Sequence, residues 1–358
     1  MSRNESVDVL RKKIDQIDER VVALLNDRAS LAQQIGHAKS QDNQDVYVPH
    51  REKEVLQRAS RLNRGPLPDP SIRSIFREIV SACRSIEAPL KVVFFGAEAT
   101  FTHLAAREKF GSAANFLPSA SINEVFEEVN QGRASFGVVP IENSTEGVIA
   151  HTLDLLVELN LKICSEIYLD IHQNLLSRTG RAADIQKIIS HPQALAQCRR
   201  WLAAHFPNVK LAEVASTAHA AMMAAADKKL GAVSNALAKE VYNLKLVAGN
   251  IEDETNNVTR FVVVGSQEPP PSGDDKTSIV FSVKDQPGIL HRMLQPFAES
   301  EINLTKIESR PIKNKPWEYL FFIDCKGHKS ETHLKKAIRT LEKSCEFLKI
   351  LGSYPSGR

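Results

Sequence analysis

Cysteine is scarce in this sequence, and the five cysteines are scattered and never form a CxxC pair. An odd number of isolated cysteines argues against a disulfide framework and a thiolate zinc site, and it favours a reducing compartment. The sequence also lacks any run of roughly 18 apolar residues that could span a membrane, and its polar N-terminus has no apolar signal-peptide core. We therefore expect a cytoplasmic protein with no membrane partner.

An excess of charge of one sign is also missing, because 46 basic residues are balanced by 43 acidic ones. Without a basic run or interleaved basic and aromatic residues, nucleic acid is a poor candidate partner. The sequence has no nucleotide-binding glycine motif and no HExxH or CxxC spacing, so we expect no cofactor and no metal. A length of 358 residues instead suggests two or three globular domains.

Proline-rich stretches divide the sequence into three parts. Ala88-Pro89 closes the first part, and the run from Gln267 to Asp275, with three consecutive prolines, is typical of a linker. We call the parts the helical segment (1–90), the α/β segment (91–267) and the C-terminal segment (275–358). The predicted fold is multidomain, with an all-α three-helix part, an α/β part and an α+β part.

The helical segment carries an apolar stripe at spacings of three and four, from Val7 to Ile35, which predicts a first helix of about 35 residues. Two further helices are predicted from Pro49 and over about Pro70–Glu87. Arg28 lies on the stripe and Lys39 continues it, where apolar residues are expected. A single polar seam residue can simply fix helix register, but two cations favour an anion pocket. Three helices of unequal length do not close a core alone, so a homodimer is expected.

The motifs of this segment resemble the all-helical chorismate mutase family. They are Leu10-Arg-Lys-Lys-Ile-Asp-Gln-Ile-Asp18, Leu24-Leu-Asn-Asp-Arg28, Ile35-Gly-His-Ala-Lys39 and Arg51-Glu52. The reaction implied is the pericyclic rearrangement of chorismate to prephenate. Such a reaction needs a held conformer and fixed cations, and no nucleophile.

The resemblance implies that Arg28 and Arg51 bind the two carboxylates of chorismate. Arg11 lies roughly 25 Å from Arg28 along one helix, so the resemblance places it in the site of a second subunit. Lys39 would contact the ether oxygen whose bond breaks, and Glu52 the ring hydroxyl.

Glu87 falls where this family has a group that donates a hydrogen bond to the ether oxygen. A carboxyl group donates only when it is protonated, so we expect mutase activity to fall as the pH rises. Val48 stands where some relatives carry an acidic residue that contacts substrate.

The α/β segment alternates short strands with helical patterns, and ligands of such folds lie beyond the carboxyl ends of strands. The runs Asn143-Ser-Thr-Glu146 and Ser190-His-Pro-Gln193 read as helix N-caps. Each run alone is more often structural than catalytic, and a His beside a proline is too, so His191 receives no catalytic role. Together the caps would direct helix N-termini at one cleft, which suits a small dianion.

Three motifs of this segment are similar to those of the prephenate dehydratases. They are the runs at 137–148, 190–197 and 257–261, the last reading Asn-Val-Thr-Arg-Phe. The resemblance implies a periplasmic-binding-protein-like cleft between one lobe of residues 91–167 with 258–265 and a second lobe of residues 168–250. It also implies that prephenate loses carbon dioxide and water there.

The resemblance gives Thr259 the role of helping hydroxide to leave, which a positioned hydroxyl can do. The first loop, Gly96-Ala97-Glu-Ala99-Thr-Phe101, departs from the family pattern. If position 99 needs a positive φ, Ala99 adds strain of about 1 kcal/mol. The substrate-positioning residues implied are Glu142, Asn143, Ser190 and Gln197, with Thr100, Phe101 and Arg260 nearby.

The C-terminal segment predicts a β-α-β-β-α-β, ferredoxin-like order. A Pro-Gly pair at 287–288 would by itself mean only a turn. The runs at 285–290 and 303–311 together resemble the ACT regulatory domain, which implies that phenylalanine binds between paired domains and inhibits the enzyme. Ile289 replaces the alanine usual in that family. The candidate effector residues are Gly288, Leu290, Asn303, Glu308, Ser309 and Arg310.

Two other interpretations remain open. The helical segment could be an inactive dimerisation element attached to a dehydratase. The whole chain could instead be a non-catalytic amino-acid sensor, but that would need no cations at Arg28 and Lys39 and no Thr259.

Overall fold

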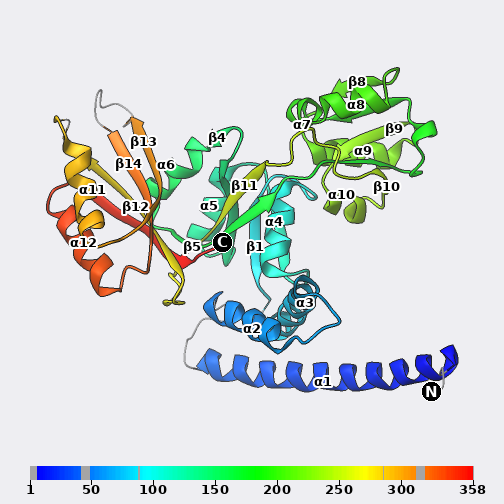
Figure 1. Cartoon of the computed structure of the whole chain (residues 1–358), viewed down its shortest axis with the longest axis horizontal. Helices are drawn as coiled ribbons and strands as arrows, with labels where there is room; N and C mark the ends of the chain where they lie inside the picture. The colour runs from blue at the N-terminus through cyan, green and yellow to red at the C-terminus, as the bar shows by residue number, and fades with distance from the viewer. Residues whose placement is uncertain (1–5, 42–48, 88, 285, 312–318, 358) are drawn as a thin grey trace, which may run out of the picture. The chain divides into compact units, whose positions relative to one another are not determined.

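The computed structural model describes residues 6–41, 49–87, 89–284, 286–311 and 319–357 (Figure 1). Val48 lies outside these residues. The chain forms two compact units, residues 1–90 with 110–115, and the remainder. No helix in the described part of the chain is long and apolar enough to cross a membrane.

The first unit contains the three predicted helices, α1 (Val7–Gln41), α2 (Pro49–Leu62) and α3 (Asp69–Glu87). Both α1 and α2 pack against α3. The apolar stripe of α1 stays uncovered within one chain. Five of its side chains, Leu10, Ile14, Ile17, Val21 and Leu24, are between 46% and 65% exposed.

The second unit begins with a mixed sheet in the order β2-β1-β3-β11-β5, with β4 paired to β3. Strand β11 comes after the second lobe in the sequence but belongs to this first sheet. It pairs antiparallel with both β3 and β5. Its neighbours in the sheet are strands that predominantly bury apolar side chains. The strands are β1 (Lys91–Phe95), β2 (Asn115–Ser119), β3 (Phe136–Asn143), β4 (Gly147–Val148), β5 (Lys162–Asp170) and β11 (Val258–Gly265), and the helices are α4 (Phe101–Phe110), α5 (Ile122–Asn130) and α6 (Ala150–Glu158).

A second sheet, in the order β10-β6-β9-β7-β8, forms the other lobe. The chain passes between the lobes at 171–173 and again at 249–257. The predicted boundary at 168 is shifted because β5 continues in the first sheet to Asp170. The strands are β6 (Asn174–Ser177), β7 (Lys187–Ser190), β8 (Lys210–Glu213), β9 (Leu230–Ser234) and β10 (Lys245–Ala248), and the helices are η1 (Ala182–Asp184), α7 (Pro192–Gln197), α8 (Arg199–His205), α9 (Thr217–Ala226) and α10 (Ala236–Val241).

The loop that follows β1 joins the two lobes. Ala99 has φ of 61° and is fully buried, so of the two possibilities that the sequence left open, the loop takes the one with a left-handed backbone at position 99. The Asn235 side chain of the second lobe donates to the Ala99 carbonyl at 2.8 Å, and the Ala99 N–H donates to His103 Nδ1 at 3.0 Å. These two hydrogen bonds hold a conformation that costs an alanine about 1 kcal/mol.

The C-terminal segment folds in the predicted order, with an antiparallel sheet β13-β14-β12-β15. The two helices cover one face of it (Figure 1). The other face packs on the first sheet, where Val280, Phe322 and Tyr354 share a core with first-lobe residues. Gly352 lies against the backbone of Ile163 on β5. The elements are β12 (Asp275–Val283), α11 (Ile289–Glu299), β13 (Leu304–Pro311), β14 (Tyr319–Lys326), α12 (Thr332–Glu342) and β15 (Phe347–Pro355).

Candidate functional sites

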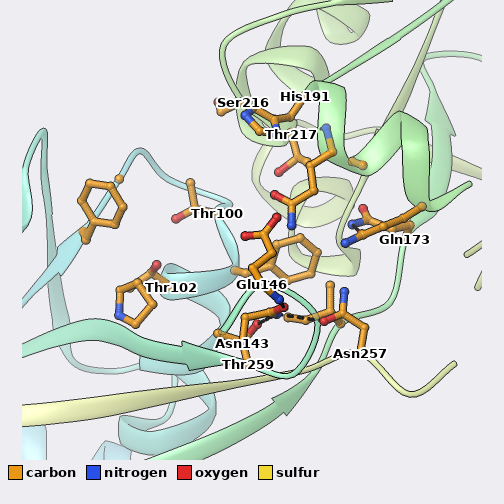
Figure 2. A pocket seen from close by; sticks show the side chains of 18 of the residues that line it. Thr100, Thr102, Asn143, Glu146, Gln173, His191, Ser216, Thr217, Asn257 and Thr259 are labelled. Atoms are coloured by element: carbon orange, nitrogen blue, oxygen red, sulfur yellow. Dashed lines mark hydrogen bonds between the residues drawn. The ribbon is translucent and has the colours of Figure 1, made fainter. Parts of the chain in front are cut away.

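A cavity of about 460 Å³ lies between the two lobes of the second unit (Figure 2). Residues of the first lobe, such as Asn143 and Thr259, and of the second lobe, such as His191 and Ser216, face each other across it. Five of the predicted site residues line it: Thr100, Phe101, Asn143, Gln197 and Thr259.

The amide of Asn143 fixes the direction of the Thr259 hydroxyl. Asn143 Oδ1 accepts hydrogen bonds from the backbone N–H groups of Thr145 and Glu146, at 2.9 and 3.1 Å, which assigns Nδ2 to the other side. Nδ2 donates to Thr259 Oγ1 at 2.7 Å and to Asn257 Oδ1 at 2.8 Å. Because Thr259 accepts from Asn143, its own proton is left for a ligand in the cavity. Asn143 therefore closes a turn after β3 and is not the helix N-cap predicted from the sequence.

Lys and Arg are absent from the described residues that line this cavity. Positive potential comes instead from helix N-termini, because α4 begins at Phe101 and α9 begins at Thr217, and both residues line the cavity. Helix N-termini favour anions. The carboxylate of Glu146, which had been interpreted only as a capping residue, faces the cavity (Figure 2).

Gln173 is a cavity residue that the sequence did not reveal. It lies on the first crossing between the lobes and is only 2% exposed. Its Nε2 donates to Gln197 Oε1 at 3.1 Å, while its own Oε1 has no hydrogen-bond partner among the described residues. Accepting this bond leaves the Gln197 N–H groups available to the cavity. A single glutamine between two strands matches no sequence motif that would predict a site residue.

His103 supports the loop that carries Thr100. Its ring stacks on Phe94, with centroids 4.5 Å apart, and its Nδ1 accepts from the Ala99 N–H. Burial, helped by the nearby Arg107 guanidinium, lowers the pKa of His103 to about 4. The ring is therefore neutral at neutral pH, as an acceptor must be.

The structure does not bring Glu142, Ser190 and Arg260 to the cavity wall. Successive strand residues point to opposite faces, and Asn143, Thr259 and Phe261, which adjoin Glu142 or Arg260 in the sequence, line the cavity. Glu142 and Arg260 therefore face the C-terminal sheet, where they line a separate pocket of about 270 Å³. Ser190 is fully buried, and its hydroxyl donates to the Val233 carbonyl at 2.6 Å. His191, not Ser190, caps α7.

In the first unit, Arg28 and Arg51 line one cavity of about 560 Å³. Arg58 and Arg61 of α2 also line it, and neither had been singled out from the sequence. Arg11 is 73% exposed and pairs at 3.7 Å with Asp8. A single continuous helix separates Arg11 from Arg28, so one chain does not bring them together.

The remaining predicted mutase residues form two ion pairs. Lys39 Nζ lies 3.3 Å from Glu87 Oε1. Gly36 lies against the Glu87 side chain, and a Cβ there would clash with it. Glu52 accepts from Arg84, a buried arginine that also donates to the Phe110 carbonyl. Arg84 was missed because it belongs to none of the motifs that the sequence analysis identified in this segment.

The predicted effector residues lie at two places in the C-terminal segment. Gly288 has φ of 72° and precedes α11, where Leu290 packs into the core under the helices. Asn303, Glu308 and Ser309 lie on or just before β13. Arg310, on the same strand, pairs at 2.6 Å with Asp154 of α6. Asp285 lies outside the described residues.

Comparisons with known proteins match all three segments. Family descriptions match residues 10–88 (chorismate mutase type II), 92–269 (prephenate dehydratase) and 277–343 (ACT domain). The bifunctional chorismate mutase/prephenate dehydratase of Aquifex aeolicus is 47% identical, and the match covers 98% of each chain.

Two solved structures resemble the chain from the α/β segment onward. Prephenate dehydratase from Arthrobacter aurescens in complex with L-Phe is 34% identical with a TM-score of 0.68, covering 75% of this chain and 90% of that one. GqqA, described as a novel type of quorum-quenching acylase, is 30% identical with a TM-score of 0.69, covering 74% and 98%.

Proposed function

This chain belongs to the family of bifunctional chorismate mutase/prephenate dehydratases of phenylalanine biosynthesis, and from that premise we propose which residues perform each of its two reactions. The chain has chorismate mutase and prephenate dehydratase activities. We propose the roles of single residues, the formation of a dimer and the inhibition by phenylalanine. A cytoplasmic location stays a prediction.

For the mutase reaction, Arg28 and Arg51 bind the carboxylates of chorismate in the cavity that they line. Lys39 stabilises the negative charge that develops on the ether oxygen. Glu87 pairs with Lys39 and holds its ammonium group in place. Glu52, fixed by Arg84, binds the ring hydroxyl.

A homodimer completes the mutase site. The exposed apolar stripe of α1 supports this, because a stripe of that length is normally covered by another helix. Two antiparallel copies of α1 would bring Arg11 of one subunit toward Arg28 of the other. In that dimer each site uses residues of both chains.

For the dehydratase reaction, the observation that carries the proposal is the Asn143–Thr259 hydrogen bond at the floor of the cavity. Thr259 donates its proton to the ring hydroxyl of prephenate, which leaves as water, and Thr259 takes up a proton from solvent to complete the cycle. The carboxylate then departs as carbon dioxide, and the electron pair of the broken C–C bond completes the aromatic ring. Gln197 and the N-termini of α4 and α9 hold the substrate anions.

Replacing Thr259 tests this role. We expect Thr259→Ala to lower dehydratase kcat by roughly 100-fold or more, because general acid catalysis contributes about that factor. Thr259→Ser keeps the hydroxyl and should retain most of the activity, and mutase activity should be normal in both variants. Near-normal dehydratase turnover in Thr259→Ala would refute the assignment.

Phenylalanine is the proposed feedback inhibitor, with Gly288, Leu290 and the residues of β13 as its site. The Arthrobacter aurescens relative crystallised with L-Phe supports this choice. An inhibitor must bind one state of the enzyme better than another. Incubating the protein with chorismate should yield prephenate and then phenylpyruvate, and millimolar phenylalanine should suppress the second step. Unchanged rates with phenylalanine would remove the regulatory proposal alone.

A further inference from the structure

A buried cluster of charged groups lies directly behind the catalytic strand β11. Arg260 is only 5% exposed. It donates to Glu166 of β5 at 2.9 Å, to Asp324 of β14 at 2.6 Å, and to the Tyr354 hydroxyl of β15 at 3.0 Å. One side chain of the α/β segment therefore binds both its own sheet and two strands of the C-terminal sheet.

Two further groups of the C-terminal sheet complete this set. Lys276 of β12 pairs with Glu166 at 2.8 Å. The Ser278 hydroxyl donates to Asp324 and shares a hydrogen bond with the Tyr354 hydroxyl at 2.6 Å. We name the six residues the Arg260 cluster: Glu166, Arg260, Lys276, Ser278, Asp324 and Tyr354.

The cluster balances two cations against two carboxylates. Burial alone lowers the pKa of Arg260, but Tyr354, Asp324 and Glu166 around it raise that pKa above its ordinary value, so the guanidinium stays charged. Buried charges are tolerated only when each is paired and hydrogen-bonded. Removing one partner leaves the others uncompensated, and the strand that carries them must move.

The cluster lies where the pairing of β11 with β3 is irregular, while its pairing with β5 continues unbroken from Val258 to Val263. The pairing of β11 with β3 shifts register between Arg260 and Phe261, one residue after the Thr259–Asn143 pair. Such a bulge interrupts the ladder of backbone hydrogen bonds and re-aims nearby side chains. On β3, Glu142 is held from the same side by Lys306 of β13 at 2.7 Å.

We propose that Arg260 is a positioning residue for the dehydratase reaction, and that the C-terminal sheet supplies the carboxylate and hydroxyl groups that hold it. By fixing β11 at the bulge, the Arg260 cluster keeps the Thr259 hydroxyl directed at the leaving group. The regulatory segment is then part of the scaffold of the active site. The inference rests on the catalytic role proposed for Thr259.

The test replaces a residue of the C-terminal segment, because that variant leaves all residues of the cavity in place. We expect Asp324→Asn to lower dehydratase kcat by about tenfold to 100-fold with KM changed less than about threefold, since small misplacements of a reacting group cost that much. Mutase activity of the same polypeptide is the internal control and should be unchanged. Arg260→Lys, which keeps the charge but loses the planar fork, should show the same split.

Lys349→Met is the matched control. Lys349 of β15 donates to the carbonyls of Leu156, Val157 and Leu159, at 2.9, 2.9 and 2.6 Å. The substitution removes a cation between the α/β segment and the C-terminal segment but changes no contact of β11. Dehydratase kcat should therefore stay near that of the parent. If Asp324→Asn does not fold, Ser278→Ala takes its place and should lower kcat by a smaller factor with KM unchanged.

A double variant shows whether the effect passes through Thr259. The loss in Thr259→Ala/Asp324→Asn should be no greater than in Thr259→Ala alone, because coupled residues are not additive. Additive losses, a raised KM at normal kcat, or an equal loss in Lys349→Met would each overturn the inference. Near-normal turnover in Thr259→Ala would instead reject the catalytic role of Thr259.

Discussion

At the scale of single residues, the dehydratase cavity depends on the direction of side-chain amides. Gln173 donates to Gln197 and thereby decides which end of that amide faces the cavity. We expect Gln173→Leu to lower dehydratase kcat/KM by about tenfold, the effect of one misdirected hydrogen bond. The loss should appear mainly in KM, measured by steady-state kinetics on prephenate.

Gln173→Glu offers a sharper comparison. A carboxylate at this position accepts from Gln197 Nε2, so the amide turns and presents its oxygen to the anionic substrate. KM should rise further than in Gln173→Leu. Equal, near-parent KM values in both variants would mean that Gln197 is oriented by something else.

His103 makes the loop at Ala99 sensitive to pH. An unfolded histidine has a pKa near 6.5, and the folded value is about 4. The unfolded state therefore binds more protons between these values, and the contribution of His103 to stability is complete above about pH 6.5 and lost as the pH falls toward 4. The thermal midpoint of the dehydratase part should fall over this window.

His103→Asn isolates that effect. Asparagine places an acceptor close to the position of Nδ1 but does not titrate. The variant should be less stable at pH 7, because the stacking on Phe94 is lost. Its thermal midpoint should also depend less on pH between 6.5 and 4 than that of the parent, and identical slopes would contradict this account of His103.

At the scale of elements, the apolar stripe of the long helix α1 is uncovered within one chain. We expect Ile17→Glu to dissociate the proposed dimer and lower mutase activity by about 100-fold, because a charge in the middle of a helix seam is costly to bury. Sedimentation and the chorismate assay measure both effects. Dehydratase activity should persist.

Asn26→Glu is the control for this helix, because position 26 is exposed and lies off the stripe. It should leave both the sedimentation and the mutase activity unchanged. A monomeric parent protein with full mutase activity would remove the need for a second subunit.

The order of helices and strands could be predicted where side chains follow one period. The apolar stripe of α1, at spacings of three and four, is an example. Strand β5 could not be predicted, because Glu166 and Ser165 interrupt its apolar run although both are buried. The burial of Glu166 depends on Arg260 and Lys276, which are far away in the sequence.

Some residues of the candidate dehydratase site could be predicted from the sequence, and others could not. Motifs indicated Asn143 and Thr259, which the structure brings together at 2.7 Å. The same motifs included Glu142 and Arg260, whose side chains point to the opposite face because strands alternate. Motif membership alone does not say which face a residue takes, and Gln173 belonged to no motif.

At the scale of the whole molecule, the proposed sharing of the mutase site between two subunits predicts that two damaged chains can restore it together. Arg11→Ala and Arg28→Ala should each abolish most mutase activity. Co-expressed in equal amounts, they should form mixed dimers with one intact site, giving about a quarter of the parent activity. Activity no greater than that of either variant alone would place Arg11 outside the site.

Gly352 bears on how such enzymes could be recombined. The backbone of β15 approaches Ile163 so closely at this point that any side chain would overlap it. A chimera that grafts a foreign C-terminal segment onto this catalytic half therefore needs a glycine at the grafted equivalent. Without a glycine there, the C-terminal sheet of the chimera could not pack against β5. The chimera would then lose dehydratase activity and, with it, the proposed inhibition by phenylalanine.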